Sequence, residues 1–476
     1  MTTADHGLPR ESFFRDYGDA LTHRTAAVFA GAGLSRAAGH VDWRGLLQEF
    51  ADELGIDLDL EQDLVSVAQY HVNAQGGTRG RLNQKIVDEF APLKEVTAAH
   101  RTLMKLPIDL FWTTNYDSLL ERAAEDVGRI PDVKLASGSL SVTVPNADVT
   151  IRKLHGDLSD PDHIVITRDD YEEYVDTHPL FRGLLQADLS SRTFLFVGFS
   201  FTDPHLDFIL GELRRLNRTS PRPHFVILKR ETSTDFASRR QTLRIEDLKR
   251  YGLNTVLVDE YDEIPALLDQ LRLRFLRRQV FVSGAAADFE PLGRDWLDEF
   301  GAIVGDRLIA RQYNIVSGFG AGVAGRVVFG ALERLYGDAG PSGPSVDKRL
   351  ILRPFPGPST AASAEVYKQY REDMLTTVGF AIFVSGNRPD GTGGVEVSTG
   401  VLDEFEIAVA NGVYPLPLGA SGWAAEQIWN AVNADMDTYF PETAPPGDAW
   451  ATLNDPGASP SDAVDALLTI MDALRP

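Results

Sequence analysis

Short apolar runs alternate with helical patterns along most of the chain, and this alternation limits the folds that are open to it. In the first half, the runs that we expect to form strands are residues 26–30, 110–112, 149–151, 164–166, 194–197, 225–228 and 255–258. In the second half, they are residues 280–282, 314–316, 349–352, 380–384 and 413–417. Strands that alternate with helices build largely parallel sheets with helices on both faces. We therefore predict the α/β class.

The chain is too long for a single hydrophobic core, because chains of more than about 250–300 residues usually split into domains. Its 476 residues fit two domains of ordinary size. A helical pattern over residues 264–278 is followed by QVFVSGAA, which opens a new strand and a glycine turn. We therefore predict one domain over residues 1–275 and a second over residues 276–476.

The composition argues against several classes of function. With 69 acidic and 46 basic residues, the formal charge of -23 repels a phosphate backbone, so we expect no nucleic-acid partner. No apolar stretch approaches about 18 residues and no signal peptide is evident, so we expect a cytoplasmic protein that does not enter a membrane. Cysteine is absent, which removes disulfides, thiol catalysis and cysteine-held zinc, and we expect no metal.

A glycine turn follows the first expected strand, in the stretch Gly31, Ala32, Gly33, Leu34 and Ser35. Glycines at this place let the backbone approach a ligand, and a helix that follows offers free amides to a pyrophosphate. A tight turn without a ligand explains the same pattern equally well. Asp42 and Arg44 lie within reach of this loop, although a simple salt bridge is the plainer explanation for Arg44.

Polar residues also follow three later strands of the first half. Asn115 and Asp117 stand in TTNYDSLLE, at the end of a sheet where α/β proteins bind ligands, although Asp117 also suits a helix cap. His155 precedes a glycine in KLHGDL, and a lone histidine is more often structural than catalytic. All 10 histidines lie in the first half, which confines imidazole chemistry to it. Gly198 and Ser200 end the fourth run, either as a ligand loop or as an ordinary turn.

In this order and spacing, the four clusters resemble the sirtuin (SIR2) family. GAGLSRAAGHVDWR matches the family pattern GAG-x-S-x-x-x-G-I-P-D-F-R, with His40, Val41 and Trp43 in place of Ile, Pro and Phe. TTNYD matches T-Q-N-x-D with Thr114 in place of Gln, LHG matches the family's His-Gly pair, and GFS takes the place of G-T-S. The resemblance covers about the first 275 residues.

The resemblance implies an NAD site and a role for each matching residue. Those that would line the NAD pocket are Gly31, Ala32, Gly33, Ser35, Asp42, Arg44, Gly198 and Ser200. Asn115 and Asp117 would approach the nicotinamide ribose, and His155 would be the general base. Departure of nicotinamide leaves an oxocarbenium-like ribose, which nearby oxygens stabilise and an oriented nucleophile attacks.

The chain differs from the protein deacylases of this family in the part of the site that would bind the molecule that attacks the ribose. Those enzymes carry a zinc module held by four cysteines, and this chain has none. That absence, the altered glutamine and an acidic TRDDYEEY segment favour water as the nucleophile, and so NAD hydrolysis with NAD as substrate and no bound cofactor. The alternatives are a protein deacylase or ADP-ribosyltransferase, and a non-catalytic nucleotide sensor.

The second half carries its own set of glycines and charges. Gly284, Gly318, Gly320, Gly322 and Gly386 follow expected strands and are suited to cradle phosphates. Together with Arg371 and Glu404, which singly suit a solvated helix face, they resemble the SLOG domain, a Rossmann-like family of nucleotide sensors. Some members are phosphoribohydrolases with a P-G-G-x-G-T-x-x-E motif. This chain reads GGVEVSTGVLDE there, which favours sensing over catalysis.

A SIR2 domain followed by a SLOG domain resembles the NAD-consuming effectors of Thoeris bacterial antiphage defence. The resemblance implies two Rossmann-like domains and a homo-oligomer, with a tetramer favoured. It also implies a functional link to a TIR-domain enzyme, which makes a cyclic ADP-ribose isomer on infection. That isomer would bind the SLOG domain at Arg371 and Glu404, release the NADase from autoinhibition and so deplete NAD.

Overall fold

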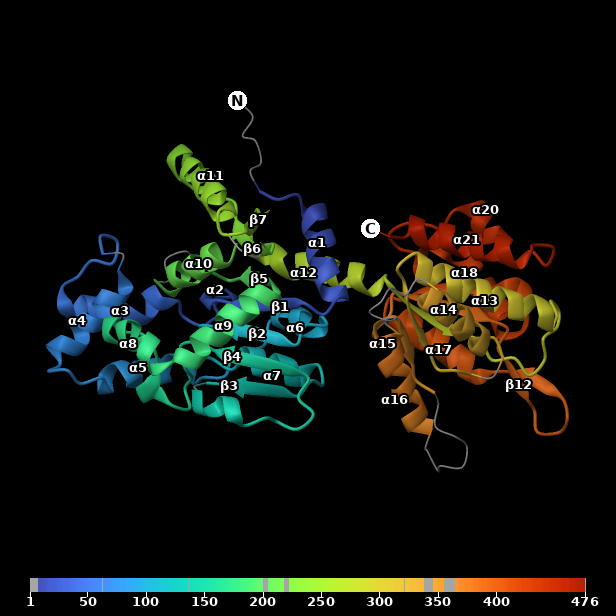
Figure 1. The fold of residues 1–476 in the computed structure, drawn as a ribbon, viewed down its shortest axis with the longest axis horizontal. Coiled ribbons are helices and arrows are strands. Elements are labelled where there is room, and N and C mark those ends of the chain that lie inside the picture. Colours follow the sequence, from blue (N-terminus) through green and yellow to red (C-terminus); the bar gives the residue numbers. More distant parts are fainter. Residues whose placement is uncertain are drawn as a thin grey trace. The chain divides into compact units, whose positions relative to one another are not determined.

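The computed structural model describes residues 7–61, 63–135, 137–199, 204–217, 222–320, 322–337, 346–354 and 364–475. The chain divides into two compact units, Met1–Arg272 and Leu273–Pro476. Each unit is built around a parallel sheet of its own, with helices packed against it (Figure 1). The predicted α/β class with two Rossmann-like units is confirmed.

The described part of the first unit forms a seven-stranded parallel sheet in the order β3-β4-β2-β1-β5-β6-β7. Its strands are β1 (Ala26–Ala30), β2 (Leu110–Thr113), β3 (Pro131–Lys134), β4 (Val149–Lys153), β5 (Thr193–Val197), β6 (His224–Lys229) and β7 (Leu253–Val258). The chain adds strands on one side of β1 first and then crosses to its other side at β5. Such a reversal opens a crevice at the carboxyl ends of the two neighbouring strands.

Helices cover both faces of this sheet. They are α1 (Arg10–Thr22), α2 (Ala32–Arg36), α3 (Trp43–Leu54), α4 (Leu64–Ala74), α5 (Gly80–Phe90), α6 (Ala98–Lys105), α7 (Leu119–Asp126), α8 (Arg168–Thr177), α9 (Pro179–Ser191), α10 (Pro204–Asn217), α11 (Asp235–Lys249) and α12 (Ile264–Leu276). Phe29 and Phe196 face the core beneath α9, α10 and α11. Phe225 points to the other face and packs against Phe13 of α1, with ring centroids 5.4 Å apart.

The helices between β1 and β2 form a smaller core of their own. Leu46, Phe50 and Val67 of α3 and α4 pack there against Ile164 and Ile166. Residues 164–166 were predicted to be a strand, and that prediction is wrong, because they form a buried loop under these helices. A short apolar run is buried equally in a strand and in a covered loop, so periodicity does not separate the two.

The second unit has a five-stranded parallel sheet in its described part, in the order β10-β9-β8-β11-β14. Its strands are β8 (Gln279–Ser283), β9 (Asn314–Ser317), β10 (Leu350–Leu352), β11 (Phe380–Val384) and β14 (Tyr414–Leu418). The chain crosses over at β8 and β11, so a second crevice is expected at their carboxyl ends. The stretch NRPDGTGG begins with β12 (Asn387–Pro389), which pairs with β13 (Val395–Val397) as an antiparallel hairpin.

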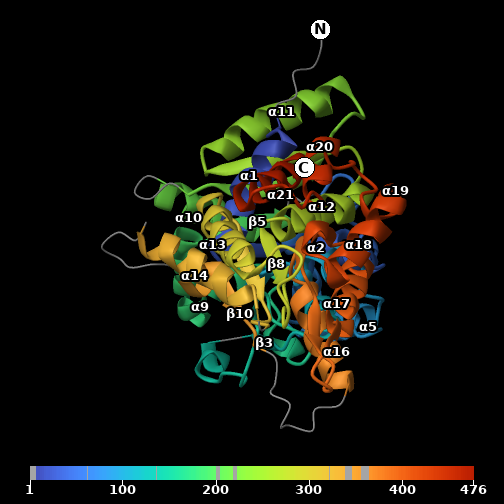
Figure 2. The ribbon, with the colours of Figure 1, turned by 90° about the vertical axis from the view of Figure 1, so that its right-hand side faces the viewer.

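The helices in the described part of this unit are α13 (Arg294–Ala310), α14 (Ala324–Gly337), α15 (Val346–Arg349), α16 (Ala364–Leu375), α17 (Thr399–Ala410), α18 (Trp423–Ala434), α19 (Met436–Tyr439), α20 (Gly447–Thr452) and α21 (Pro460–Ala473). Figure 2 shows α13 and α14 on one side of the second sheet and α17 and α18 on the other. Gly305 of α13 and Gly330 of α14 lie at the contact between their helices. A side chain on either glycine would overlap the main chain of the facing helix, so glycine permits the close packing.

Among the described residues, no helix is both long enough and apolar enough to cross a bilayer. The same residues contain no group of three or more histidine or carboxylate side chains arranged to hold a metal ion.

Candidate active site

Two glycine turns interlock at the crevice of the first unit. Gly31 and Gly33 follow β1, and Gly198 follows β5 with a left-handed φ of 76°. The amide of Gly33 donates to the oxygen of Gly198 at 2.7 Å. A Cβ on Gly31 would lie 2.6 Å from that same oxygen. The glycines therefore permit a close approach between two stretches of main chain, as well as any approach to a ligand.

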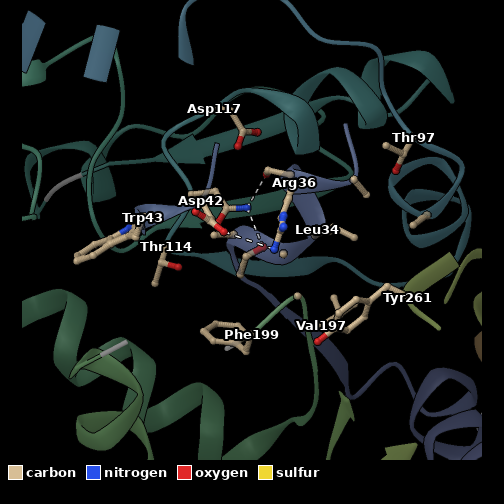
Figure 3. Close-up of a pocket in the computed structure, with 18 of the residues that line it drawn as sticks. Leu34, Arg36, Asp42, Trp43, Thr97, Thr114, Asp117, Val197, Phe199 and Tyr261 are labelled. Carbon is tan, nitrogen blue, oxygen red and sulfur yellow. Dashed lines mark hydrogen bonds and ion pairs between the residues drawn. The ribbon is translucent and has the colours of Figure 1, made fainter. Parts of the chain in front are cut away.

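A cavity of about 910 Å³ opens beside these turns (Figure 3). This volume lies at the upper end of the range of about 300–1,000 Å³ that is common for small-molecule sites. Of the residues predicted to bind or cleave NAD, those that line it are Gly31, Ala32, Gly33, Ser35, Asp42, Arg44, Asn115, Asp117 and Gly198. Sequence positions 31 to 198 are thus brought to one site, at the ends of β1, β2 and β5.

Asn115 links the loop after β2 to the first glycine turn by hydrogen bonds. Its side-chain nitrogen donates to Ser35 Oγ at 2.8 Å and to the main-chain oxygen of Gly31 at 3.1 Å. The Asn115 side-chain oxygen is buried and accepts no hydrogen bond from the described residues. A buried polar atom without a partner is costly, so this oxygen is suited to receive a hydrogen bond from a ligand.

The carboxylate of Asp117 has one occupied and one open oxygen. Oδ1 accepts the amide of Leu119 at 2.9 Å, so the predicted role next to a helix start is real. Oδ2 is buried and has no hydrogen-bond partner among the described residues. Asp117 therefore keeps one carboxylate oxygen without a hydrogen-bond partner on a residue that lines the cavity.

Asp42 and Arg44 stand where α3 begins, and both make structural contacts. Asp42 caps the helix, accepting the amide of Gly45 at 2.9 Å. Arg44 donates to the main-chain oxygen of Leu58 at 2.8 Å and pairs with Asp59. The simple salt-bridge interpretation of Arg44 therefore holds, even though its side chain reaches the cavity wall.

His155 follows β4 and is fully buried, with 0% of its surface exposed. It is not among the described residues that line the cavity. Its ring lies 6.4 Å from the ring of Trp43, which does line the cavity, and 5.7 Å from the ring of Tyr171. Sequence reasoning thus placed His155 near the site, while the structure separates it from the cavity surface. Ser200, the remaining predicted residue, lies outside the described residues.

Sequence reasoning missed other residues that complete the cavity. Arg36 of α2 pairs with Asp42 at 3.4 Å and is a cation at the mouth of the site (Figure 3). Phe199 and Phe90 add apolar wall, and Tyr261 enters from the segment after β7. Arg36 lies inside the stretch that matches the family pattern, so proximity to the glycine turn was a usable signal. No sequence signal pointed to Tyr261, because it is distant in sequence from the four clusters that match the family.

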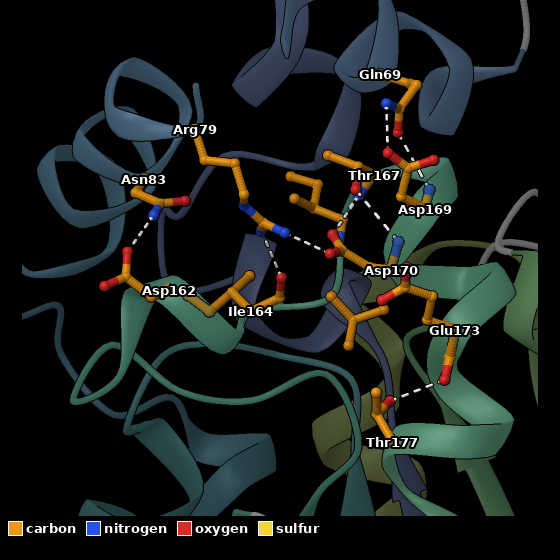
Figure 4. Close-up of polar contacts among 12 residues, drawn as sticks. Gln69, Arg79, Asn83, Asp162, Ile164, Thr167, Asp169, Asp170, Glu173 and Thr177 are labelled. Atoms are coloured by element: carbon orange, nitrogen blue, oxygen red, sulfur yellow. Dashed lines mark hydrogen bonds and ion pairs between the residues drawn. The ribbon is translucent and has the colours of Figure 1, made fainter. Parts of the chain in front are cut away.

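The acidic TRDDYEEY segment forms the start of α8, and its charges are engaged with neighbouring helices (Figure 4). Asp169 accepts from Gln69 of α4 at 2.9 Å, and Asp170 pairs with Arg79 beside α5. Asp170 also completes a capping box with Thr167. These contacts account for the acidic residues as helix caps and ties, so the segment supplies no independent argument about the acceptor.

The predicted nucleotide residues of the second unit gather at its own crevice. Gly284 follows β8 and Gly386 follows β11, and these strands are neighbours. Gly322 bridges to Ala285, which ties the loop after β9 to the loop after β8. Gly318 and Gly320 belong to the same loop after β9, where Gly318 is buried and Gly320 is exposed.

A buried carboxylate marks this second crevice. Glu404 of α17 accepts from Ser283 at 2.6 Å and lies 3.7 Å from Arg371 of α16. Burial raises the pKa of Glu404 to about 7, although Ser283 and Arg371 act in the opposite direction. Arg371 also lies 3.4 Å from Asp403. Arg371 and Glu404, predicted separately, thus form one pair.

Two protein-family models match the chain. A SIR2-like domain matches residues 109–252, and the Sir2- and TIR-associating SLOG family matches residues 263–474.

Several curated proteins match over nearly the whole chain. The NAD(+) hydrolase ThsA of Bacillus cereus (strain MSX-D12) is 38% identical over 473 residues, which cover 98% of each chain. The protein of the same name from Cytobacillus dafuensis is 35% identical over 489 residues, covering 98% of this chain and 97% of its own. That from Enterococcus faecium is 36% identical over 452 residues, covering 92% and 93%. With this identity over this length, the chain belongs to the ThsA family.

Proposed function

We propose that this chain hydrolyses NAD to nicotinamide and ADP-ribose in the cavity of the first unit. The observation that carries the proposal is the buried side-chain oxygen of Asn115, which has no partner among the described residues and belongs to a residue in the wall of the cavity beside the two glycine turns. The names of the relatives, NAD(+) hydrolase, support the same substrate and reaction.

The reaction breaks the bond between the ribose C1′ atom and the nicotinamide nitrogen. The bonding electrons leave with nicotinamide, which becomes neutral, and C1′ becomes oxocarbenium-like. The carboxylate of Asp117 stabilises the positive charge, and Asn115 orients the attacking water through its open oxygen. The water oxygen bonds to C1′ and gives up one proton.

We assign that proton to His155 as general base. The ring is buried next to Trp43, which lines the cavity. In this assignment the bound substrate opens a path between the ring and the cavity at Trp43. A base must come within hydrogen-bond reach in the substrate complex, and that reach commonly tightens only after binding.

We further propose that a cyclic ADP-ribose isomer binds the second unit and activates hydrolysis. The phosphates would lie at the glycine loops after β8, β9 and β11, with Arg371 as their cation and Glu404 as an acceptor for ribose hydroxyls. Activation requires that the isomer prefer the active state, since equal affinity for both states shifts nothing. The consequence in a bacterial cytoplasm is NAD depletion during phage infection, with a TIR-domain enzyme as the source of the activator.

The proposed assembly is a homo-oligomer, and a tetramer is favoured. Phe329 and Tyr336 of α14 are 50% and 64% exposed and lie seven positions apart, on one face of the helix. Large apolar side chains exposed together are suited to contact a second copy.

The proposed chemistry is tested by turnover of NAD by purified full-length variants. We expect His155→Ala and Asn115→Ala each to lose at least about 100-fold in kcat. His163→Ala is the matched control, because His163 is a surface histidine whose side chain is 77% exposed. Retention of kcat by both site variants, with folding intact, would contradict the proposed function.

A further inference from the structure

A fully buried lysine stands between the two segments that carry Asn115 and His155. Lys153 is the last residue of β4, two positions before His155, and its side chain is 0% exposed. Its strand partner in β2 is Thr113, two positions before Asn115. Lys153 does not line the cavity, so any effect on the reaction must pass through other residues.

The ammonium group of Lys153 contacts the loop of Asn115 through main-chain atoms. It donates to the oxygen of Asp117 at 2.6 Å and to the oxygen of Tyr116 at 3.3 Å. Main-chain contacts of this kind fix the path of the loop without depending on its side chains. The loop carries both the open oxygen of Asn115 and the open oxygen of Asp117.

The same ammonium group contacts the turn that follows His155. It pairs with Asp157, whose other carboxylate oxygen accepts the amide of Ser159 at 2.9 Å. It also pairs with Glu121 of α7 at 2.9 Å. One charged group therefore joins the Asn115 loop (residues 113–119), the first turn of α7 and the His155 turn (residues 154–158).

The carboxylates of Glu121 and Asp157 stabilise the charged form of the buried Lys153. Burial disfavours the charged lysine, but its two carboxylate partners outweigh burial and raise the pKa of Lys153. Burial raises the pKa of Glu121, while the pKa of Asp157 is lowered, because attraction and hydrogen bonding from Lys153 outweigh its burial. A buried ion pair that loses one partner leaves an uncompensated charge, which is strongly destabilising. Lys153, Glu121 and Asp157 are therefore held in contact with one another.

We infer that Lys153 is a positioning residue for NAD cleavage, which fixes the Asn115 loop relative to the His155 turn. The inference rests on the proposed function, in which these two segments act on the same water molecule. A misplacement of about 1 Å in such a pair costs about 100-fold in rate. Lys153 thus determines the rate of cleavage without touching the substrate.

Lys134 offers a matched control on the neighbouring strand β3. Its side chain is 8% exposed and pairs with Asp132 at 2.8 Å, and it also donates to the main-chain oxygen of Val142. It is therefore a buried, paired lysine in the same sheet, and within the described part of the chain its ammonium group bonds to Asp132 and Val142 rather than to the Asn115 loop or the His155 turn. Loss of this pair tests what removal of a buried charge does to the fold alone.

The experiment measures kcat and KM for NAD with the full-length chain and the variants Lys153→Met and Lys134→Met, in the presence of cyclic ADP-ribose and its linkage isomers. We expect Lys153→Met to lose about 100-fold in kcat with a change of less than about threefold in KM. Lys134→Met should keep kcat within about twofold, even if both variants unfold at similarly lowered temperatures. Equal kcat in the two variants overturns the inference.

A second variant covers the case in which Lys153→Met does not fold. Asp157→Asn keeps the size of a side chain that is 19% exposed and can still accept the amide of Ser159. It should lower kcat by about 10-fold, whereas an unchanged kcat would contradict the inference. If the wild-type chain turns over no NAD, the proposed function fails. Hydrogen exchange of residues 113–119 and 154–158 then tests by itself whether Lys153 fixes these two segments, with faster exchange expected in the Lys153 or Asp157 variant and not in Lys134→Met; unchanged exchange would contradict that.

Discussion

Asn115 donates its side-chain amide to Ser35 Oγ over 2.8 Å, so a residue after β2 is fastened to a residue of the first glycine turn. The amide also meets the main-chain oxygen of Gly31 at 3.1 Å. A carbonyl oxygen can only accept, which fixes the nitrogen of Asn115 on that side. The side-chain oxygen is consequently the atom left to meet a ligand, and this geometry decides which end of Asn115 acts.

Removal of the Ser35 hydroxyl should loosen this arrangement. Ser35→Ala removes the hydroxyl and leaves the rest of the side chain in place. Of the two acceptors of the Asn115 side-chain nitrogen among the described residues, the main-chain oxygen of Gly31 then remains. We expect kcat for NAD to fall by about 10-fold and the free energy of unfolding by about 1 kcal/mol. Steady-state kinetics and denaturant titration measure both. An unchanged kcat would mean that Ser35 does not orient Asn115.

The interlocked glycine turns predict a large cost for a single methyl group. Gly198→Ala places a Cβ against the main-chain nitrogen of Leu34 at a positive φ of 76°. Gly128 is the control, because it has the same φ of 76° with no atom within 4 Å of an added Cβ. We expect about 1 kcal/mol of destabilisation for Gly128→Ala and at least about 2 kcal/mol more for Gly198→Ala, measured by denaturant titration. Equal costs would show that the contact is not tight.

Glu404 predicts a pH dependence for the stability of the second unit. Its pKa of about 7 in the folded chain lies above the ordinary value of 4.5, so the folded state holds a proton that the unfolded state releases. Stability therefore falls as pH rises from about 4.5 to about 7, by an amount on the order of 3 kcal/mol. Burial is the main cause of the raised pKa; of the groups that face Glu404, Ser283 and Arg371 lower the pKa and Asp403 raises it.

The variant Glu404→Gln keeps the shape of the side chain and removes its titration. We expect the unfolding transition of the second unit to lose most of its slope between pH 5 and 7, as followed by thermal melts at several pH values. A slope identical to that of the wild type would place the titrating group elsewhere.

Arg371 predicts a defect that is confined to activation. With Arg371→Ala we expect the activator concentration for half-maximal NAD turnover to rise by at least about 10-fold, because a charged hydrogen bond to a phosphate contributes about 1.5–3 kcal/mol. Arg349→Ala is the control. Arg349 directly precedes β10, so it lies at the amino end of the strands, away from the glycine loops, and it donates to the main-chain oxygens of Ile309 and Tyr313. A similar loss in both variants would reflect folding and not activator contact.

The sequence predicted the strands best where an apolar run was long and ended in a glycine turn. The run before Gly31 and the run before Gly198 became neighbouring strands, and their turns meet in the crevice. Asn115 and Asp117 were predicted from their position after a strand, and they line the same cavity. Local pattern and sheet topology agree at these residues, which is why they were predictable.

Other features depend on contacts that no local pattern records. Residues 164–166 resemble a strand, but the helices of the smaller core cover them as a loop. The short strand β3 contains the polar residues Asp132 and Lys134, which are buried and pair with each other. Lys153 likewise reads as a surface residue until Glu121 and Asp157 are brought to it. Burial of a charge is a property of the tertiary structure.

NAD hydrolysis by the first unit is tested by the rate at which the purified full-length chain converts NAD to nicotinamide and ADP-ribose, with and without cyclic ADP-ribose and its linkage isomers. We expect slow turnover by the chain alone and a marked rise in kcat with at least one isomer, with the two products formed in equal amounts. Intact NAD under every condition would contradict the hydrolase, and full turnover that is indifferent to every isomer would contradict activation through the second unit.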